Sequence, residues 1–167
     1  MNEGKIPSFT TGGGHRRVWD KDLAVFLKAH NIPVPANLQA EEALVLIVDD
    51  EEAVRYSTER MLKSLFPSLR IEHAVDGFEA GYKVVSLMPA LVLLDFKLPG
   101  LDGLKVAKSI RQDTALRGIK IVFMSGYATQ ELKDKATREG ADDFLAKPFT
   151  IEDLKNKVLK CLPSLKQ

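Results

Sequence analysis

The stretch LVLLDFKLPG, residues 91–100, decides which fold this sequence can adopt. Four consecutive apolar residues are typical of a strand that is buried on both faces, as strands of parallel sheets are. Asp95 follows them directly and would stand at the carboxyl end of that strand. Ligands of open α/β sheets bind at this edge. The stretch therefore predicts a buried parallel strand that brings a carboxylate to a binding site.

Two more apolar runs end in charged residues. Asp49-Asp50-Glu51 follows the run 44–48, and Lys147-Pro148 follows the run 143–146. Carboxylates that are gathered at one rim repel one another and raise each other's pKa unless a cation holds them ionised. Hard carboxylate oxygens suit Mg²⁺. The three strand ends together predict an acidic rim with a metal ion and one lysine.

The composition excludes several classes of protein. The chain has 167 residues, 45% hydrophobic and 28% charged, which suits one soluble domain with an appendage. The net charge of +1 excludes a global field that would attract polyanions. The single cysteine, Cys161, cannot form an internal disulfide, which indicates a reducing compartment. Without a signal peptide or a membrane-length apolar stretch, we expect a cytoplasmic protein with no membrane partner.

Strand-like and helix-like segments alternate from residue 44 onward. Strands are predicted at 44–48, 70–75, 91–94, 119–124 and 143–146, with helices between them and after the last. Asp76 and Thr150 are predicted helix N-caps, and Gly140 suits the end of a helix. Five such units predict an α/β fold, a flavodoxin-like five-stranded parallel sheet in the order 2-1-3-4-5 with helices on both faces. Pro33 and Pro35 predict a linker at 31–42, between a segment at 1–30 and a domain at 43–163.

Four short motifs carry a resemblance to a known family. They are VDDE (48–51), LDFKLPG with the following DG (94–103), MSG (124–126) and GADDFLAKPF (140–149). In this order, and at successive strand ends, they resemble the phospho-acceptor receiver domain of two-component response regulators, which is CheY-like in fold. The resemblance covers residues 43–163.

The resemblance implies a metal-assisted phosphorylation site. Asp95 would accept a phosphoryl group as an aspartyl phosphate. Asp50 and Asp95 would bind Mg²⁺, with Asp49 assisting through a metal-bound water. By the same analogy, the backbone carbonyl of Lys97 would be a further ligand.

The same resemblance assigns the groups that respond to the phosphate. Lys147 would pair with one phosphate oxygen, and Ser125 would donate its hydroxyl to another. Gly126 would leave room for that approach. Phe144 occupies the aromatic position that reports the phosphorylated state in this family, here without the hydroxyl of a tyrosine. The family also implies a cis peptide bond at Lys147-Pro148.

The implied function is a signalling switch rather than an enzyme. A sensor histidine kinase or a phosphotransfer protein would phosphorylate Asp95, and the conformational change would regulate an output, for example transcription. A homodimer through the last two strand-helix units is a further expectation. The only catalysis expected is that of the protein's own phosphorylation and dephosphorylation.

Other interpretations remain open at this point. Taken one by one, the acidic pair could start a helix, Asp95 could form a turn, and Lys147 could be a solvated surface lysine. An Asp-nucleophile phosphohydrolase would want a second Asp where Lys97 stands. A receiver-like docking module that is never phosphorylated is another alternative, and a flavin or nucleotide carrier a third. Asp142 and Asp143 are interpreted as solvated or capping charges.

The segment 1–30 has a weaker resemblance. Gly12-Gly13-Gly14-His15-Arg16-Arg17 before a short amphipathic helix looks like the wing and following helix of a MerR/excisionase-type winged helix-turn-helix. Arg16 and Arg17 would then contact DNA phosphates, which adds affinity but little sequence specificity. The helix-turn-helix pair that should precede the wing is missing, so we expect either a truncated motif or a basic tail. DNA would be a partner only with the missing part present.

Overall fold

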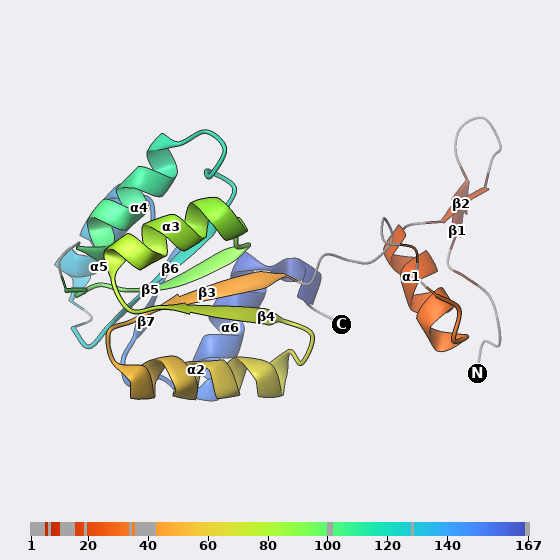
Figure 1. Cartoon of the computed structure of the whole chain (residues 1–167), viewed down its shortest axis with the longest axis horizontal. Coiled ribbons are helices and arrows are strands. Elements are labelled where there is room, and N and C mark those ends of the chain that lie inside the picture. Colours follow the sequence, from red (N-terminus) through yellow and green to blue (C-terminus); the bar gives the residue numbers. More distant parts are fainter. Residues whose placement is uncertain are drawn as a thin grey trace. The chain divides into compact units, whose positions relative to one another are not determined.

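The computed structural model describes residues 6, 8–10, 16–18, 20–33, 35, 43–99, 102–127 and 129–165. The chain divides into two compact units, residues 1–42 and residues 43–167 (Figure 1).

The larger unit is built on a five-stranded parallel sheet. Its strands are β3 (Leu44–Val48), β4 (Arg70–Ala74), β5 (Leu91–Asp95), β6 (Lys120–Ser125) and β7 (Asp143–Ala146). They are ordered β4-β3-β5-β6-β7 and every neighbouring pair is parallel. Within this unit the order is 2-1-3-4-5, so the predicted flavodoxin-like fold is confirmed. The predicted bounds differ from the observed ones by at most one residue at either end of a strand.

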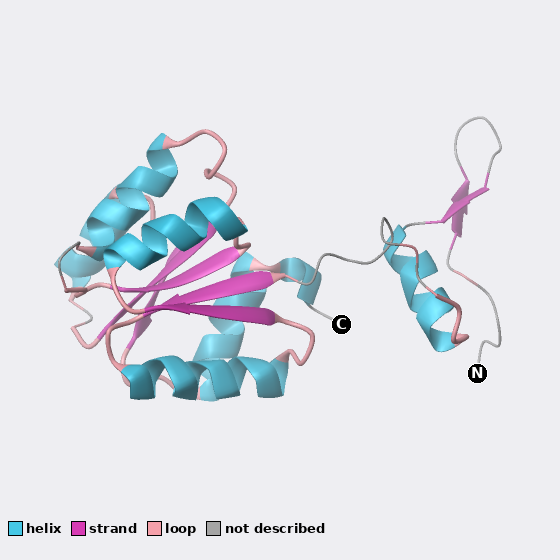
Figure 2. Ribbon diagram, viewed as in Figure 1, coloured by secondary structure: helices cyan, strands magenta, loops and turns pink. Residues whose placement is uncertain are grey.

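Helices cover both faces of this sheet. Helices α2 (Glu52–Leu65) and α6 (Ile151–Cys161) lie together on one face. Helices α3 (Gly77–Leu87), α4 (Gly103–Gln112) and α5 (Gln130–Arg138) lie on the other (Figure 2). A short 3₁₀ helix, η2 (Pro163–Leu165), follows α6. This unit therefore has three layers, with the sheet in the middle.

The central strands are buried because both of their faces are covered. Every residue of β3 and β5 is buried, as are five of the six residues of β6. Alternate side chains of each strand enter one of two apolar cores. One core contains Leu62, Leu154 and Val158 from α2 and α6, and the other contains Val84 and Ala107 from α3 and α4. A strand without a solvated face explains why the sequence shows continuous apolar runs.

Local capping signals in the sequence are confirmed. The Asp76 carboxylate accepts hydrogen bonds from the main-chain N–H groups of Phe78 and Glu79 at the start of α3. Thr150 and Asp153 form a reciprocal capping box at the start of α6. Gly140 follows α5 with a φ of 102°, a left-handed conformation that favours glycine. These caps fix where each helix begins or ends relative to the sheet.

The interpretation of Asp142 and Asp143 as solvated or capping charges is wrong. Asp142 accepts hydrogen bonds from Arg111 and Lys120, each at 2.8 Å, and from the main-chain N–H of Ile121 at 2.9 Å. The Asp143 side chain is only 11% exposed, and two lysines of α6 donate to it, each at 2.7 Å. Through these hydrogen bonds, both carboxylates connect the start of β7 to neighbouring elements.

The smaller unit contains a hairpin and a helix. Strands β1 (Ser8–Thr10) and β2 (Arg16–Val18) pair antiparallel, and α1 (Asp20–Ala29) follows. Residues 12–14, His15 and Trp19 lie outside the described residues. The described part of this unit does not show a helix-turn-helix.

Among the described helices, we find none whose length and apolar content would allow it to cross a lipid bilayer.

Candidate functional site

The carboxyl ends of four strands meet at a polar pocket. Its lining comprises Asp50, Glu51, Asp95, Lys97, Ser125, Gly126, Tyr127, Lys147 and Pro148. These residues follow or end β3, β5, β6 and β7. The parallel sheet therefore collects residues from four distant parts of the chain at one edge, as the sequence predicted.

Lys147 joins two carboxylates at the base of this pocket. Its ammonium group lies 2.5 Å from an oxygen of Asp49 and 2.6 Å from an oxygen of Asp95. The Asp49 side chain is fully buried, that of Asp95 is 10% exposed and that of Lys147 is 17% exposed. The peptide bond between Lys147 and Pro148 is cis, as the family resemblance implied. One ammonium group thus forms ion pairs with two nearly buried carboxylates.

This unequal pairing shifts the pKa values of the groups. Burial raises the pKa of Asp95, and the neighbouring charge of Asp49 adds to that effect, while the Lys147 ammonium and the Lys97 N–H oppose it. Burial by itself would lower the pKa of Lys147, but its hydrogen bonds to Asp49 and Asp95 outweigh burial and raise that pKa. Lys147 therefore stays charged, and Asp95 gives up its proton less readily than an exposed aspartate.

The acidic pair after β3 points in two directions. Asp49 uses one oxygen for Lys147 and accepts a hydrogen bond on the other from the main-chain N–H of Glu51 at 3.0 Å. Asp50 is exposed and lines the pocket. The buried Arg55 of α2 donates to the backbone carbonyls of Asp49 and Asp50 at 2.7 and 3.1 Å. Arg55 thus holds the main chain that aims Asp50 at the pocket.

The Asp95 loop is held by short-range contacts. The main-chain N–H of Lys97 donates to the second carboxylate oxygen of Asp95 at 2.7 Å. Helix α4 begins so close to this loop that a Cβ added to Gly103 would lie 2.4 Å from the Asp95 carbonyl oxygen. Asp102 caps that helix by accepting from the Leu104 N–H at 3.0 Å. Gly103 is therefore required for the close approach of α4 to the loop.

The outer part of the pocket carries Ser125 and two larger side chains. Ser125 is buried at the end of β6, and its hydroxyl oxygen accepts from the Tyr127 N–H at 3.1 Å. The Lys97 ammonium lies 4.5 Å from the centre of the Tyr127 ring, in cation–π contact. Tyr127 is 65% exposed. This contact joins the segments that follow β5 and β6, and both side chains line the same pocket as Asp95.

Phe144 lies outside the pocket. It is half-buried in β7, packs against the core of α3, α4 and α5, and lies 5.9 Å from the Lys133 ammonium of α5. Its predicted role as a conformational reporter stays a prediction. A movement of the Phe144 ring would change its contact with the Lys133 ammonium.

The rim fits a magnesium ion by its chemistry. Mg²⁺ in proteins uses one or two carboxylates and retains several waters. Asp50 and Asp95 both line this pocket and can offer it carboxylate oxygens. Within the described ranges no group of three or more Asp, Glu, His or Cys side chains could hold a metal ion. The donor set thus suits a hydrated cation rather than one enclosed by protein ligands, and Asp49 is engaged elsewhere.

Arg16 and Arg17 belong to the smaller unit, on strand β2. Both side chains are exposed, and the Arg16 guanidinium donates to the Ser8 hydroxyl of β1 at 2.8 Å. Their predicted contact with DNA phosphate stays a prediction.

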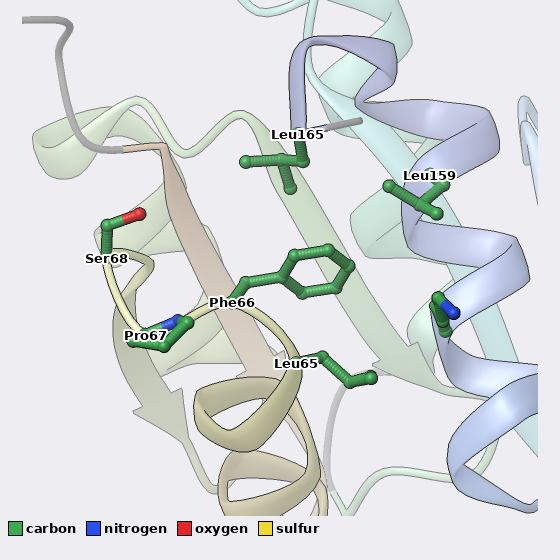
Figure 3. A pocket seen from close by; sticks show the side chains of 7 residues that line it. Leu65, Phe66, Pro67, Ser68, Leu159 and Leu165 are labelled. Carbon is green, nitrogen blue, oxygen red and sulfur yellow. The ribbon is translucent and has the colours of Figure 1, made fainter. Parts of the chain in front are cut away.

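A second, mostly apolar pocket lies between the end of α2 and helix α6. Figure 3 shows Phe66 directed towards α6, with Leu65, Leu159 and Leu165 around it. Pro67, Ser68 and Lys155 complete the lining. With one ammonium and one hydroxyl, this pocket lacks the convergent carboxylates of the rim.

Sequence reasoning missed Arg55 and the reason for Gly103. Arg55 lies on the same inner face of α2 as Thr58 and Leu62, at a spacing of three and then four residues. That spacing was the available signal, although an arginine is seldom placed on a buried stripe. For Gly103 the sequence offered only its position after Asp102, because the clash is with a carbonyl eight residues earlier.

Comparisons with known proteins agree with this geometry. Residues 45–159 match the profile of the response regulator receiver domain. The chain is 32% identical to sporulation initiation phosphotransferase F of Bacillus subtilis over 121 residues, which cover 71% of this chain and 93% of that protein. It is 28% identical to protein PilG of Pseudomonas aeruginosa over 126 residues, covering 75% and 92% of the two chains. A crystal structure of a receiver domain protein from Methanospirillum hungatei superposes with a TM-score of 0.66 at 28% identity, covering 74% and 96%.

Proposed function

The chain belongs to the receiver domain family of two-component response regulators, and from that premise we propose that Asp95 is its phosphorylation site. The proposed donor is a histidine kinase or a phosphotransfer protein. The observation that carries the proposal is the bridge of Lys147 between Asp49 and Asp95 at the base of the pocket. It puts a nearly buried carboxylate, one ammonium and an open polar space within reach of one another.

In the proposed reaction, a carboxylate oxygen of Asp95 forms a bond to phosphorus. The bond between phosphorus and the donor's imidazole nitrogen breaks, and its electron pair stays with the imidazole. Most of the barrier to such a transfer is positioning and charge. The Lys97 N–H fixes one oxygen of Asp95, so the carboxylate is already oriented towards the pocket. Ser125 stands at the neighbouring strand end, where its hydroxyl can donate to a phosphate oxygen.

Receiver domains typically bind Mg²⁺ at this acidic site, and we propose Asp50, Asp95 and the Lys97 carbonyl as its ligands here. When bound, the ion offsets the negative charge that the phosphoryl group brings to the carboxylates. Asp49 has a different role in this proposal: it keeps the Lys147 ammonium at the base of the pocket while phosphate is absent.

Phosphorylation changes the partners of Lys147. A phosphate on Asp95 offers the ammonium a more highly charged acceptor than the carboxylate it replaces. Movement of Lys147 would displace the end of β7, the strand that carries the half-buried Phe144. We propose that this movement biases β6, α5 and β7 between two arrangements, which an output partner can distinguish.

A direct test uses a small-molecule phosphodonor. The chain is incubated with acetyl phosphate and Mg²⁺, and its intact mass is measured with and without the substitution Asp95→Asn. We expect one added phosphoryl group on the wild-type chain and none on the variant. Asp142→Asn serves as a control for a carboxylate at the opposite edge of the sheet. Equal incorporation into the Asp95→Asn chain would show that another residue is phosphorylated.

A further inference from the structure

Helix α3 carries an exposed apolar surface that the proposed phosphorylation does not use. Eleven large apolar residues of the described chain are exposed, and six of them fall between residues 75 and 88. Phe78 and Tyr82 are 73% and 74% exposed, and Val85 is 62% exposed. Such a concentration on one short segment is unusual for a monomer's surface.

The opposite side of the same helix is already packed on the domain. Ala80 and Val84 are buried against the core that α3 shares with α4. A helix with apolar side chains on both faces is typical of a helix that is covered on both faces. The outer face of α3 therefore lacks its cover within the described part of residues 43–167.

The centre of this outer face is a notch at Gly81. Phe78, Gly81, Tyr82 and Val85 are spaced by three, one and three residues, so they share one face of the helix. A Cβ built on Gly81 meets nothing within 4 Å, so no contact within the described part of the larger unit requires a glycine there. Glycine inside a helix is destabilising relative to alanine. A contact with another molecule that requires close approach at position 81 would explain why this residue is a glycine.

We propose that this α3 surface (Val75, Phe78, Gly81, Tyr82, Val85 and Met88) binds a second copy of the chain, with two α3 helices packed antiparallel about a two-fold axis near Gly81. In that arrangement the Tyr82 ring of each copy enters the Gly81 notch of the other, and Phe78 faces Val85. Knob and hole lie on adjacent residues of the same helix, so the surface is complementary to itself, as a two-fold interface requires.

Charge also favours a second copy over a charged partner. The two charged residues of α3, Glu79 and Lys83, form an ion pair with each other at 2.9 Å. Lys83 also donates to the main-chain carbonyl of His73, so it is held against the domain. The exposed stripe itself is uncharged, so two copies do not repel each other there.

This α3 surface differs from the last two strand-helix units, which contribute only Tyr127 and Ile151 to the exposed large apolar residues of the described chain.

The size of the surface predicts a weak dimer. Two aromatic and three aliphatic side chains offer roughly 450 Å² per copy, against about 800 Å² per partner in a standard interface. An interface of this size belongs with the weak, transient ones. Dimerisation should be visible at high protein concentration and absent in dilute solution.

Sedimentation velocity of the full chain, over a concentration series up to about 1 mM, tests the proposal. Tyr82→Lys should weaken self-association at least about ten-fold, because each dimer contains the substitution twice. Tyr56→Lys is the matched control. Tyr56 is 51% exposed but lies on α2, where it contacts His73, so this variant should associate like the wild type.

Gly81→Ala separates a docking role from a structural one. Alanine should raise the thermal midpoint, because it favours the helix and meets open space within the chain. The same substitution fills the notch and should weaken self-association. A wild-type chain that stays monomeric throughout the series would overturn the proposal and leave the surface to another partner. Self-association that persists unchanged in Tyr82→Lys would overturn it as well, since the dimer would then use another face.

Discussion

Replacing Lys147 by methionine should destabilise the fold strongly at neutral pH. Methionine keeps most of the side-chain volume but removes the cation between Asp49 and Asp95. Asp95 borders the open pocket and can be hydrated there. Asp49 is fully buried and would keep a negative charge without a cation. Removing one partner of a buried ion pair costs about 3–5 kcal/mol, because the other charge is left uncompensated.

Proton uptake sets a ceiling on this cost. A carboxyl group with an ordinary pKa of about 3.9 can be protonated at pH 7 for about 4 kcal/mol, at about 1.4 kcal/mol per pH unit. A buried carboxyl group that has lost its cation can take up a proton instead of remaining charged, so the loss caused by its charge cannot exceed that value. At pH 5 the ceiling falls to about 1.5 kcal/mol. The penalty of Lys147→Met should therefore shrink by about 2–3 kcal/mol between pH 7 and pH 5.

The sign of this pH dependence follows from linkage. In the variant, a carboxyl group that is left buried without a cation has a higher pKa in the folded state than in the unfolded state, so the folded state binds more protons at intermediate pH. Its stability relative to the wild type then rises as the pH falls from 7 towards the unfolded pKa. Lys147 in the wild type also has a raised pKa, so its contribution is complete below about pH 10.5 and is lost above that pH.

Urea unfolding followed by circular dichroism at pH 7 and pH 5 measures these differences. The double variant Lys147→Met with Asp49→Asn is the matched control, because it removes the stranded charge together with its partner. We expect it to recover most of the loss at pH 7 and to show little pH dependence. A loss below about 1 kcal/mol at pH 7 would refute the reasoning. So would a double variant no more stable than Lys147→Met alone.

Three further predictions concern other parts of the domain. Gly103→Ala should lower the free energy of unfolding by about 1–3 kcal/mol, because its methyl group would overlap the Asp95 carbonyl. Gly118→Ala meets open space and should not lower it, and urea unfolding compares the two variants. Asp143→Asn should lower the free energy of unfolding by about 1–2 kcal/mol at pH 7, and by progressively less as the pH falls below about 3.8. Burial opposes the ionised form of Asp143, but two lysines outweigh it and lower its pKa, so its contribution is present above about pH 3.8 and lost as the pH falls. Tyr127→Ala should shorten the lifetime of the phosphorylated chain about two- to five-fold, since it removes the ring that holds Lys97 over the pocket. Decay of the added mass should be unchanged in Tyr127→Phe, and equal lifetimes in all three chains would contradict this role.

Features that depend on local or uniform burial could be predicted from the sequence. Strands β3 and β5 are covered on both faces, so their apolar runs identify them without knowledge of their neighbours. The Thr150 capping box depends on residues only three positions apart. The meeting of Asp95 and Lys147 could also be predicted, because the carboxyl ends of parallel strands share one edge. In each case the signal is contained in a few consecutive residues or in the topology itself.

Charges buried by distant partners could not be predicted in this way. Arg111 and Asp142 are 31 residues apart, and Lys157 contacts Asp143 only because α6 packs back over β7. A charged side chain is mostly exposed in proteins, so sequence reasoning assigns it to solvent by default. Whether its partner is within reach depends on how two elements pack, which no local pattern records. The same limit applies to Gly103, whose constraint is a carbonyl on another element.

Helix α3 shows a third kind of limit, in which the sequence pattern itself is ambiguous. Asp76 marks where the helix begins, but apolar residues then occur on both sides of it. A periodic pattern identifies a core face by its contrast with a polar one, and here there is no such contrast. The structure separates the two faces by showing that Ala80 and Val84 fill the core while Phe78 and Tyr82 do not. The side that the core leaves exposed is therefore the informative one, because an exposed apolar patch of this kind is typical of an interaction site.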